Sequence, residues 1–170
     1  MNDKVFAQQF AHELDMEIPS TLKCLERISS ELYSYKPHDR SMELGYLTLL
    51  VAEIPLWIAL ITEQDEIDFS TYQHRQPENT QQIVDLFHDN VAKAKQALAG
   101  VKEGALDKPF YLKKAGEVLL ESTKREQIES TINHMVHHRG QLSVYMRLND
   151  IAVPSIYGPS ADDRSYGGGK

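Results

Sequence analysis

Three of the seven histidines in this 170-residue chain fall within five residues, at His134, His137 and His138. On a helix, with about 100° per residue, His134 and His138 lie about 40° and one turn apart. Two imidazoles at this spacing can bind the same ion, as they do on zinc-binding helices. His137 falls about 60° to the other side of His134, so we expect it to face solvent.

Structural packing is the alternative interpretation of this pair, because two histidines one turn apart on a helix often hydrogen-bond within a core. A catalytic zinc site usually has three protein ligands and one open position, and the spacing supplies only two. Met135 and Leu142 lie toward the centre of the apolar face of the same helix. The pair is therefore expected at the edge of the buried stripe, where a cavity mouth is predicted.

Four amphipathic segments are predicted to be the helices that position these residues. Apolar residues recur at helical spacing over four stretches, which are about Asp3 to Ser30, Ser41 (as N-cap) to Ile61, Asn79 to Gly100 and Thr123 to Asn149. Pro19 and Pro55 fall inside the first two and are expected to bend or disturb them.

The predicted fold class is all-α, a four-helix bundle with an irregular third connection. Residues 101–122 show only a weak secondary-structure pattern. Short extended segments around 110–112 and 118–120 are the alternative to a wholly irregular connection. The C-terminal tail from about residue 150 is expected to be irregular. A chain of this length predicts a single domain, residues 1–170.

The composition excludes several functional classes. Eighteen Lys and Arg against 25 Asp and Glu give a net charge of −7, which opposes binding to nucleic acid and to anionic membranes. The apolar run from Leu44 to Ile61 is interrupted by Glu53 and Pro55, so we expect a buried helix and not a membrane span. A single cysteine and no signal-peptide pattern predict a cytoplasmic protein.

The chain resembles the DinB-like (DinB/YfiT) metalloenzymes, which are four-helix bundles. The resemblance rests on HHRGQLSVYMR (137–147), PSIYGPSAD (154–162), KPH (36–38), SMELG (41–45) and VAEIPLW (51–57), with Glu17 in the first helix. It covers nearly the whole chain.

The resemblance implies a divalent metal, zinc or nickel, held by three histidines. Two of these map onto His134 and His138, and the third position is Leu50, which cannot coordinate a metal. Leu50 shares the predicted inward face of its helix with Leu47 and Ile54, so its side chain is expected to point at the site. Glu53 is a poor replacement unless Pro55 turns it inward. The remaining alternatives are His38 and His12.

The function implied by the resemblance is metal-dependent chemistry on a small electrophile, by thiol S-transfer or by hydrolysis, with a low-molecular-weight thiol as the partner substrate. The alternative is a non-enzymatic, metal-free bundle that binds a small ligand or dimerises. A homodimer is compatible with such a bundle, but no apolar stripe can be assigned to an interface. The sequence identifies no catalytic residue and no organic cofactor site.

Other residues that could do chemistry have structural interpretations. Cys24 is expected to be a small buried residue. Arg139 and Arg147 are expected to be solvated or paired on the surface, with binding of an anionic substrate as the alternative. Tyr145 either touches the site or lies in the core, and Gly140 is expected to allow close helix packing.

Overall fold

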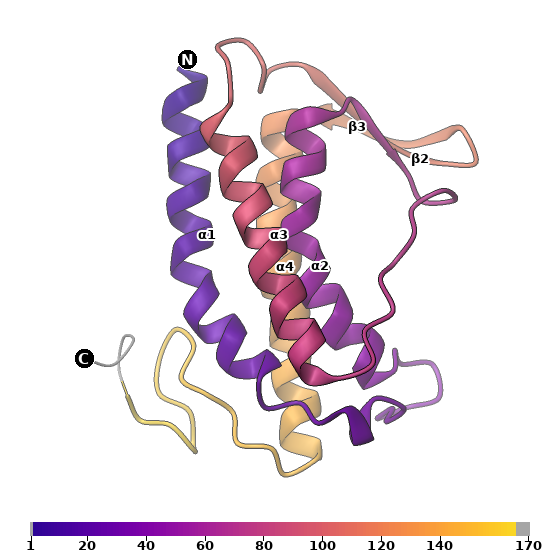
Figure 1. Ribbon diagram of the computed structural model, residues 1–170, viewed down its shortest axis with the longest axis vertical. Helices are drawn as coiled ribbons and strands as arrows, with labels where there is room; N and C mark the ends of the chain where they lie inside the picture. The colour runs from indigo at the N-terminus through magenta and orange to yellow at the C-terminus, as the bar shows by residue number, and fades with distance from the viewer. Residues whose placement is uncertain (1, 166–170) are drawn as a thin grey trace.

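Four long helices and a small sheet make up the computed structural model, which describes residues 2–165 (Figure 1). In chain order the elements are α1 (Asp3–Leu25), the 3-10 turn η1 (Ser30–Leu32), α2 (Leu44–Glu63), β1 (Glu66–Asp68), α3 (Thr80–Ala99), β2 (Pro109–Lys114), β3 (Glu117–Thr123) and α4 (Lys124–Leu148). Residues 149–165 contain no helix or strand, as predicted for the tail.

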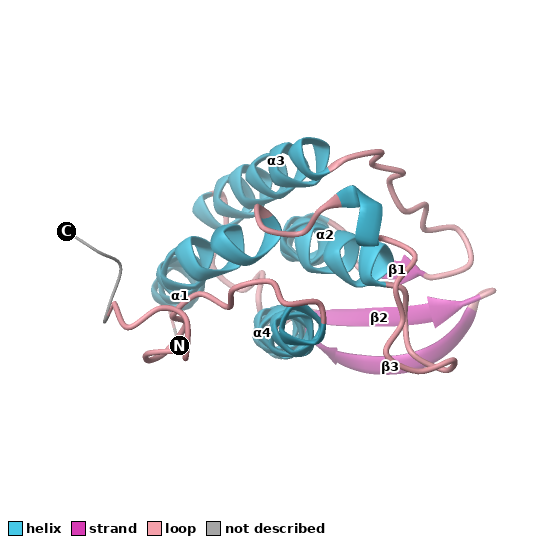
Figure 2. Cartoon of the chain, turned by 90° about the horizontal axis from the view of Figure 1, so that it is seen from below, coloured by secondary structure: helices cyan, strands magenta, loops and turns pink. Residues whose placement is uncertain are grey.

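The helices lie side by side, with α2 packed against α3 and α4, and α1 against the same two helices. Helices α2 and α3 run in the same direction, so the chain between them returns along the outside of the molecule (Figure 1). The sheet lies on one side of the helices, next to α2 and α4 (Figure 2).

The second helix forms the centre of the core. Its buried side chains include Leu47, Val51, Ile54 and Ile58, and 78% of its most apolar stretch is buried inside the protein. It is long and apolar enough to cross a membrane, but this degree of burial is what the core helix of a soluble protein shows. The helix continues through Pro55, and Asn90 of α3 donates a hydrogen bond to Ala52 O close to that proline.

The all-α prediction was wrong, because residues 66–68, 109–114 and 117–123 form a three-stranded sheet. The third connection is therefore a hairpin and not an irregular segment, and its strands include the short extended pieces expected at 110–112 and 118–120. Ala115 and Gly116 both have positive φ, the backbone of a two-residue hairpin turn. The Asp68 carboxylate accepts hydrogen bonds from both of their amides, across 47 and 48 residues of sequence.

Helix ends were predicted with mixed success. The capping box of Thr123 and Glu126 is present at α4, and the Asn79 side chain accepts from the Gln82 amide at α3. Two predictions were wrong: α1 ends at Leu25 and not near Ser30, and α2 begins at Leu44 with Glu43, not Ser41, as its N-cap.

A buried ion pair joins the last helix to the first. Arg139 is only 1% exposed, and its guanidinium lies 2.6 Å from the Glu17 carboxylate. It also donates to the hydroxyls of Ser20, Thr21 and Tyr157. The expectation that Arg139 is a surface residue was therefore wrong, because these partners compensate the cost of burying its charge.

Close packing at Gly140 was also a wrong prediction. A Cβ added there would meet nothing within 4 Å, and the residue is exposed on α4. In contrast, a Cβ added at Gly45 of α2 would lie 2.7 Å from the Cβ of Tyr33.

Gly140→Ala is therefore expected to raise the free energy of unfolding by about 0.5–1 kcal/mol, because alanine restricts the unfolded chain and favours helix. Gly45→Ala, the matched control, is expected to lower it through the clash with Tyr33. Urea denaturation followed by circular dichroism measures both. A destabilised Gly140→Ala protein would show that something packs against this face in solution.

Candidate functional site

The two histidines of α4 face each other directly. His134 Nε2 and His138 Nε2 are 2.7 Å apart, and the ring centroids are 4.4 Å apart. Their convergence confirms the expectation from helical spacing. His137 is exposed on the neighbouring side of the helix, as predicted.

A glutamine on the next turn fixes the protons of this pair. His138 Nδ1 lies 2.8 Å from Gln141 Oε1, and because an amide oxygen only accepts, the His138 proton is placed on Nδ1. His138 Nε2 then carries a lone pair, which accepts the hydrogen bond from His134 Nε2–H. A partner that sets the tautomer in this way is typical of metal-binding histidines.

Both imidazoles favour the neutral form. Burial, together with the neighbouring His138 and His137, lowers the pKa of His134 to about 4. Burial also lowers the pKa of His138. Near pH 7 the pair is therefore uncharged, which is the form of imidazole that binds metals.

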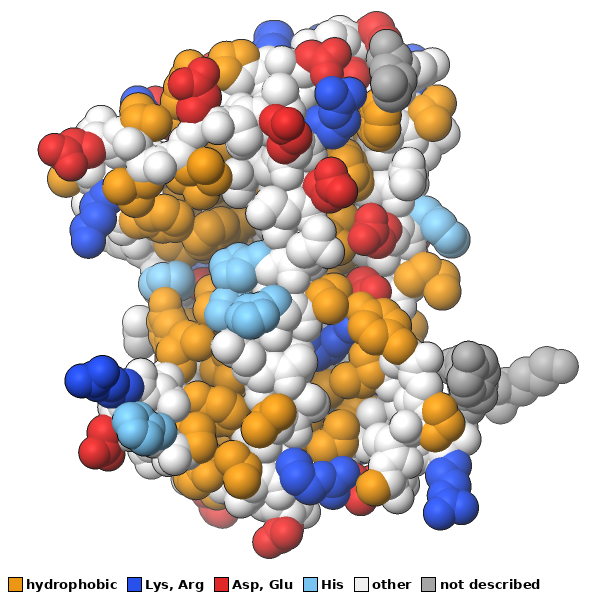
Figure 3. Space-filling view, turned by 180° about the vertical axis from the view of Figure 1, so that it is seen from behind, with side chains coloured by type: hydrophobic (Ala, Val, Ile, Leu, Met, Phe, Trp, Pro, Cys, Tyr) orange, Lys and Arg blue, Asp and Glu red, His pale blue; other side chains and the backbone are white. Residues whose placement is uncertain are grey.

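A cavity of about 590 Å³ opens beside His134, between α2, α4 and the sheet. Its apolar wall is formed by Leu50, Trp57, Phe69, Leu112 and Leu120. Polar groups come mainly from α4 and include Gln127, Thr131, Asn133, His134 and His137. Figure 3 shows several histidine side chains gathered at the middle of this face, next to hydrophobic side chains. A mostly apolar cavity with a few polar groups is typical of a small-molecule site.

Leu50 lines the same cavity as His134, as its helical position predicted. It contributes no donor atom, so the wall of α2 is apolar where the resemblance implied a ligand. Glu53, one turn later, is 1% exposed and is bound to the chain between α2 and α3. Its Oε2 lies 2.5 Å from His74 Nδ1, and its Oε1 accepts from the Arg75 amide at 2.8 Å.

His74 is the site residue that the sequence analysis missed. It lies in the connection, half-buried, and it lines the cavity together with Leu50 and His134. No periodic pattern marks a histidine in a polar loop. The available signal was Glu53, because a carboxylate in the middle of an apolar helix needs a partner when it is buried.

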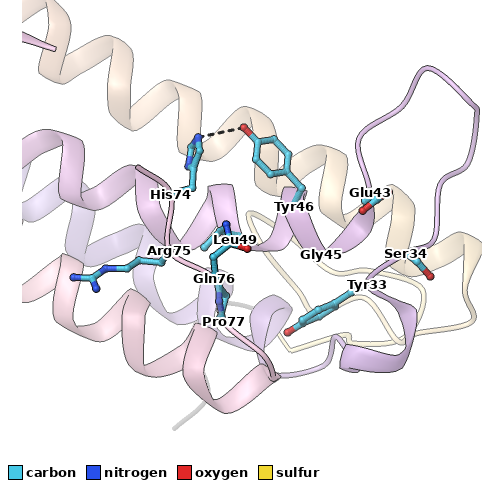
Figure 4. Close-up of a pocket in the computed structure, with 10 residues that line it drawn as sticks. All are labelled: Tyr33, Ser34, Glu43, Gly45, Tyr46, Leu49, His74, Arg75, Gln76 and Pro77. Carbon is cyan, nitrogen blue, oxygen red and sulfur yellow. Dashed lines mark hydrogen bonds between the residues drawn. The ribbon is translucent and has the colours of Figure 1, made fainter. Parts of the chain in front are cut away.

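A second cavity, of about 470 Å³, lies on the other side of His74 and Tyr46 (Figure 4). The Tyr46 hydroxyl is 3.5 Å from His74 Nε2, at the outer limit of a hydrogen bond. Arg75, Glu43 and Tyr33 also line this cavity, but none of the α4 histidines does. Tyr46 and His74 therefore separate it from the cavity at the histidine pair.

The imidazole nitrogens at the larger cavity supply part of the ligand set that a divalent metal ion needs. His138 Nε2 offers a lone pair, and His134 Nε2, 2.7 Å away, offers another to the same ion once its proton has moved to Nδ1. Within residues 2–165, however, no three His, Cys, Asp or Glu side chains stand close enough together to hold a metal. The pair therefore supplies two ligands of the usual three.

The other candidates have structural roles or lie on the surface. Cys24 is fully buried, and burial raises the pKa of its thiol to about 11, so it is not a nucleophile at neutral pH. Tyr145 is a core residue whose hydroxyl donates to Met42 O. Arg147 pairs with Asp162 on the surface. His38 and His12 are exposed, and neither lines this cavity.

Acidification is expected to destabilise the fold through the histidine pair. The pKa of His134 is 6.5 in the unfolded chain and about 4 in the folded protein. Between these two pH values the unfolded state therefore binds more protons than the folded state. The free energy of unfolding therefore falls as the pH falls through this window. Denaturation at pH 4.5 to 7 is expected to show a shallower pH slope for His134→Gln, whereas His12→Gln keeps the full slope. An unchanged slope in His134→Gln would contradict this.

The DinB family model matches residues 1–166. YjoA of Bacillus subtilis (strain 168), an uncharacterized protein, is 30% identical over 129 residues, which cover 75% of this chain and 80% of YjoA. YrdA of the same organism, also uncharacterized, is 24% identical over 156 residues, covering 91% of this chain and 89% of YrdA.

Two crystal structures have the same fold. The DinB-like protein YjoA from Bacillus subtilis superposes with a TM-score of 0.65 and 22% identity, covering 92% of this chain and 99% of that one. A DinB-like protein from Bacillus cereus ATCC 10987 gives a TM-score of 0.64 and 23% identity, covering 89% and 95%. With the family match over nearly its full length, this chain belongs to the DinB family.

Proposed function

We propose that this protein is a metal-dependent enzyme that acts on a small electrophile in the cavity beside His134. The observation that carries the proposal is the pair of neutral imidazoles with Nε2 atoms 2.7 Å apart, in which His134 lines a cavity of about 590 Å³ and His138 lies buried behind it. Zinc or nickel bound by His134 and His138 supplies Lewis-acid activation of water or of a low-molecular-weight thiol. The reaction class is thiol S-transfer or hydrolysis.

The surrounding residues prepare the site for this role. Gln141 holds the His138 tautomer whose Nε2 lone pair accepts from His134 in the structure and turns to the ion when one binds. Leu50, Trp57 and Phe69 give the cavity an apolar wall, which excludes water and strengthens polar interactions inside. His137, at the exposed side of the cavity, is available to contact a substrate as it enters.

The alternative function is that of a metal-free protein that binds a small ligand in the same cavity. Leu50 favours it, because an apolar side chain stands where a third ligand was expected. The hydrogen bond within the histidine pair also favours it, since the pair is satisfied without an ion. Metal analysis separates the two functions.

We infer a cytoplasmic protein that binds neither nucleic acid nor membrane, from the net charge of −7 and the free, buried Cys24. The homodimer stays a prediction, which the sedimentation coefficient of the purified chain tests.

Protein purified without a histidine tag is expected to contain close to one equivalent of zinc or nickel, measured by inductively coupled plasma mass spectrometry. The double variant His134→Ala/His138→Ala is expected to lose it, because both ligands are removed. His137→Ala, which removes an exposed histidine of the same cavity, is the control and keeps the metal. Wild-type protein that stays metal-free after incubation with excess ion would support the alternative function.

Leu50→His is expected to strengthen metal binding at least tenfold, because it adds an imidazole to the cavity wall next to His134. Isothermal titration calorimetry with Zn²⁺ measures the change. Leu49→His, one residue earlier on α2 and outside this cavity, is the matched control and is expected to leave the affinity unchanged. Equal affinities for Leu50→His and the wild type would mean that Leu50 does not face the ion.

A further inference from the structure

The amide of Gln127 is a buried hydrogen-bond donor at the wall of the larger cavity. Gln127, in the first turn of α4, is 7% exposed and lines the cavity beside His134. Within residues 2–165 nothing accepts a hydrogen bond from its Nε2, and Nε2 is not among the unpartnered polar atoms that are sealed from solvent. Because an unused buried donor is costly, this amide is suited to bind an acceptor that enters the cavity.

The neighbouring strand fixes how the amide is turned. Leu120 and Ser122 are two residues apart on β3, so their side chains lie on the same face of the sheet. Leu120 lines the cavity, and the Ser122 hydroxyl donates to Gln127 Oε1 at 3.2 Å. Since the amide oxygen is held by Ser122, the NH2 group is turned away from it and is the part of Gln127 left for a ligand.

Gln127 and His134 stand on one face of α4, two turns apart. Seven residues turn a helix by about 700°, within about 20° of two full turns, and advance it by about 10 Å. Thr131 lines the cavity between them, but its hydroxyl already donates to Gln127 O. A ligand that lies along α4 therefore meets a free donor at one end and His134 at the other.

The wall that faces α4 is apolar. Leu112 and Leu120 are cross-strand partners on β2 and β3, and both line the cavity together with Trp57 and Phe69. Phe69 is 39% exposed and Leu120 is 47% exposed. A ligand in the cavity covers apolar surface that otherwise stays in water, which favours a ligand with an apolar body.

The cavity offers no counter-charge to an ionic ligand. Among the described residues that line it there is no Lys, Arg, Asp or Glu, and the chain as a whole carries a net charge of −7. Burying a charge without a partner is costly, and the negative protein disfavours an anion further. The group that accepts from Gln127 is therefore a neutral carbonyl oxygen and not a carboxylate or a phosphate.

We propose that the cavity selects a neutral, elongated and largely apolar molecule with a carbonyl oxygen about 10 Å from its reacting end, and that Gln127 is the specificity residue that binds this oxygen. The reacting end lies at His134, so the spacing rests on the proposed function. The carbonyl contact does not, because the Gln127 donor faces the cavity whether the protein transfers a thiol, hydrolyses its substrate or only binds a ligand.

The probe is 6-phenylhexan-2-one, which joins a phenyl ring to a neutral carbonyl through a chain that spans two helical turns. Its matched partner is 5-phenylpentanoate, in which a carboxylate replaces the methyl ketone. Trp57 is the single tryptophan of the chain and lines the cavity, so one indole N–H signal in NMR titrations of tag-free, metal-free protein reports both affinities. The wild type is expected to bind the ketone at least fivefold more tightly than the carboxylate.

Gln127→Met keeps the length of the side chain and removes the donor. It is expected to weaken ketone binding about fivefold, the usual effect of losing one hydrogen bond. Asn133→Ala, which removes an exposed amide from the same cavity, is the control and is expected to change the affinity less than twofold. In the wild type, ketone is expected to shift the side-chain amide signal of Gln127, which keeps the test decisive if Gln127→Met does not fold.

Three results would overturn the carbonyl contact: no ketone binding, a carboxylate bound as tightly as the ketone, or binding that leaves both the Gln127→Met affinity and the Gln127 amide signal unchanged. The ketone is also expected to shift the ring signals of His134, and unmoved signals would overturn the 10 Å spacing. None of these results bears on metal content. A protein that binds the ketone through Gln127 but takes up no zinc or nickel would overturn the proposed function and leave the carbonyl contact standing.

Discussion

The second helix is apolar almost all round, and the rest of the structure depends on covering it. Its most apolar stretch is 78% buried, so each side of the helix must meet another element. Helices α3 and α4 cover most of it. The small sheet covers the remainder through β1 and the residues of β2 that face the cavity. Hydrophobic burial on this scale is the main favourable term in folding.

Because α2 is buried, its polar side chains also need hydrogen-bond partners inside the protein. Thr48 satisfies itself by donating to Leu44 O within the helix. Glu53 has no partner on α2, and its carboxylate is instead bound by the ring of His74 and the amide of Arg75. Because an unpaired buried carboxylate is costly, Glu53 holds the long connection against the helix. A group that looks out of place in the core thus positions a histidine at the cavity.

The two sides of the cavity differ in charge. On α4, burial is the main cause that lowers the pKa of both His134 and His138, and the neighbouring His137 lowers both as well, so the neutral forms are favoured. On α2, the side chain that holds His74 is a carboxylate. Glu53 itself does not line the cavity, and His74 stands between its carboxylate and the cavity. Away from the cavity, the buried pair of Arg139 and Glu17 ties α4 to α1.

Local patterns in the sequence determined the four helices, the capping box at Thr123 and the convergence of His134 and His138, because these depend on residues within one or two turns of each other. Tertiary structure alone decided the sheet, the burial of Arg139 and the place of His74. Asp68 stabilises a turn more than 40 residues away, and Glu53 binds a histidine 21 residues away. Such pairings depend on how the helices are arranged in space, including which of them run parallel. Helical periodicity shows which face of a helix is buried, but it does not show in which direction neighbouring helices run.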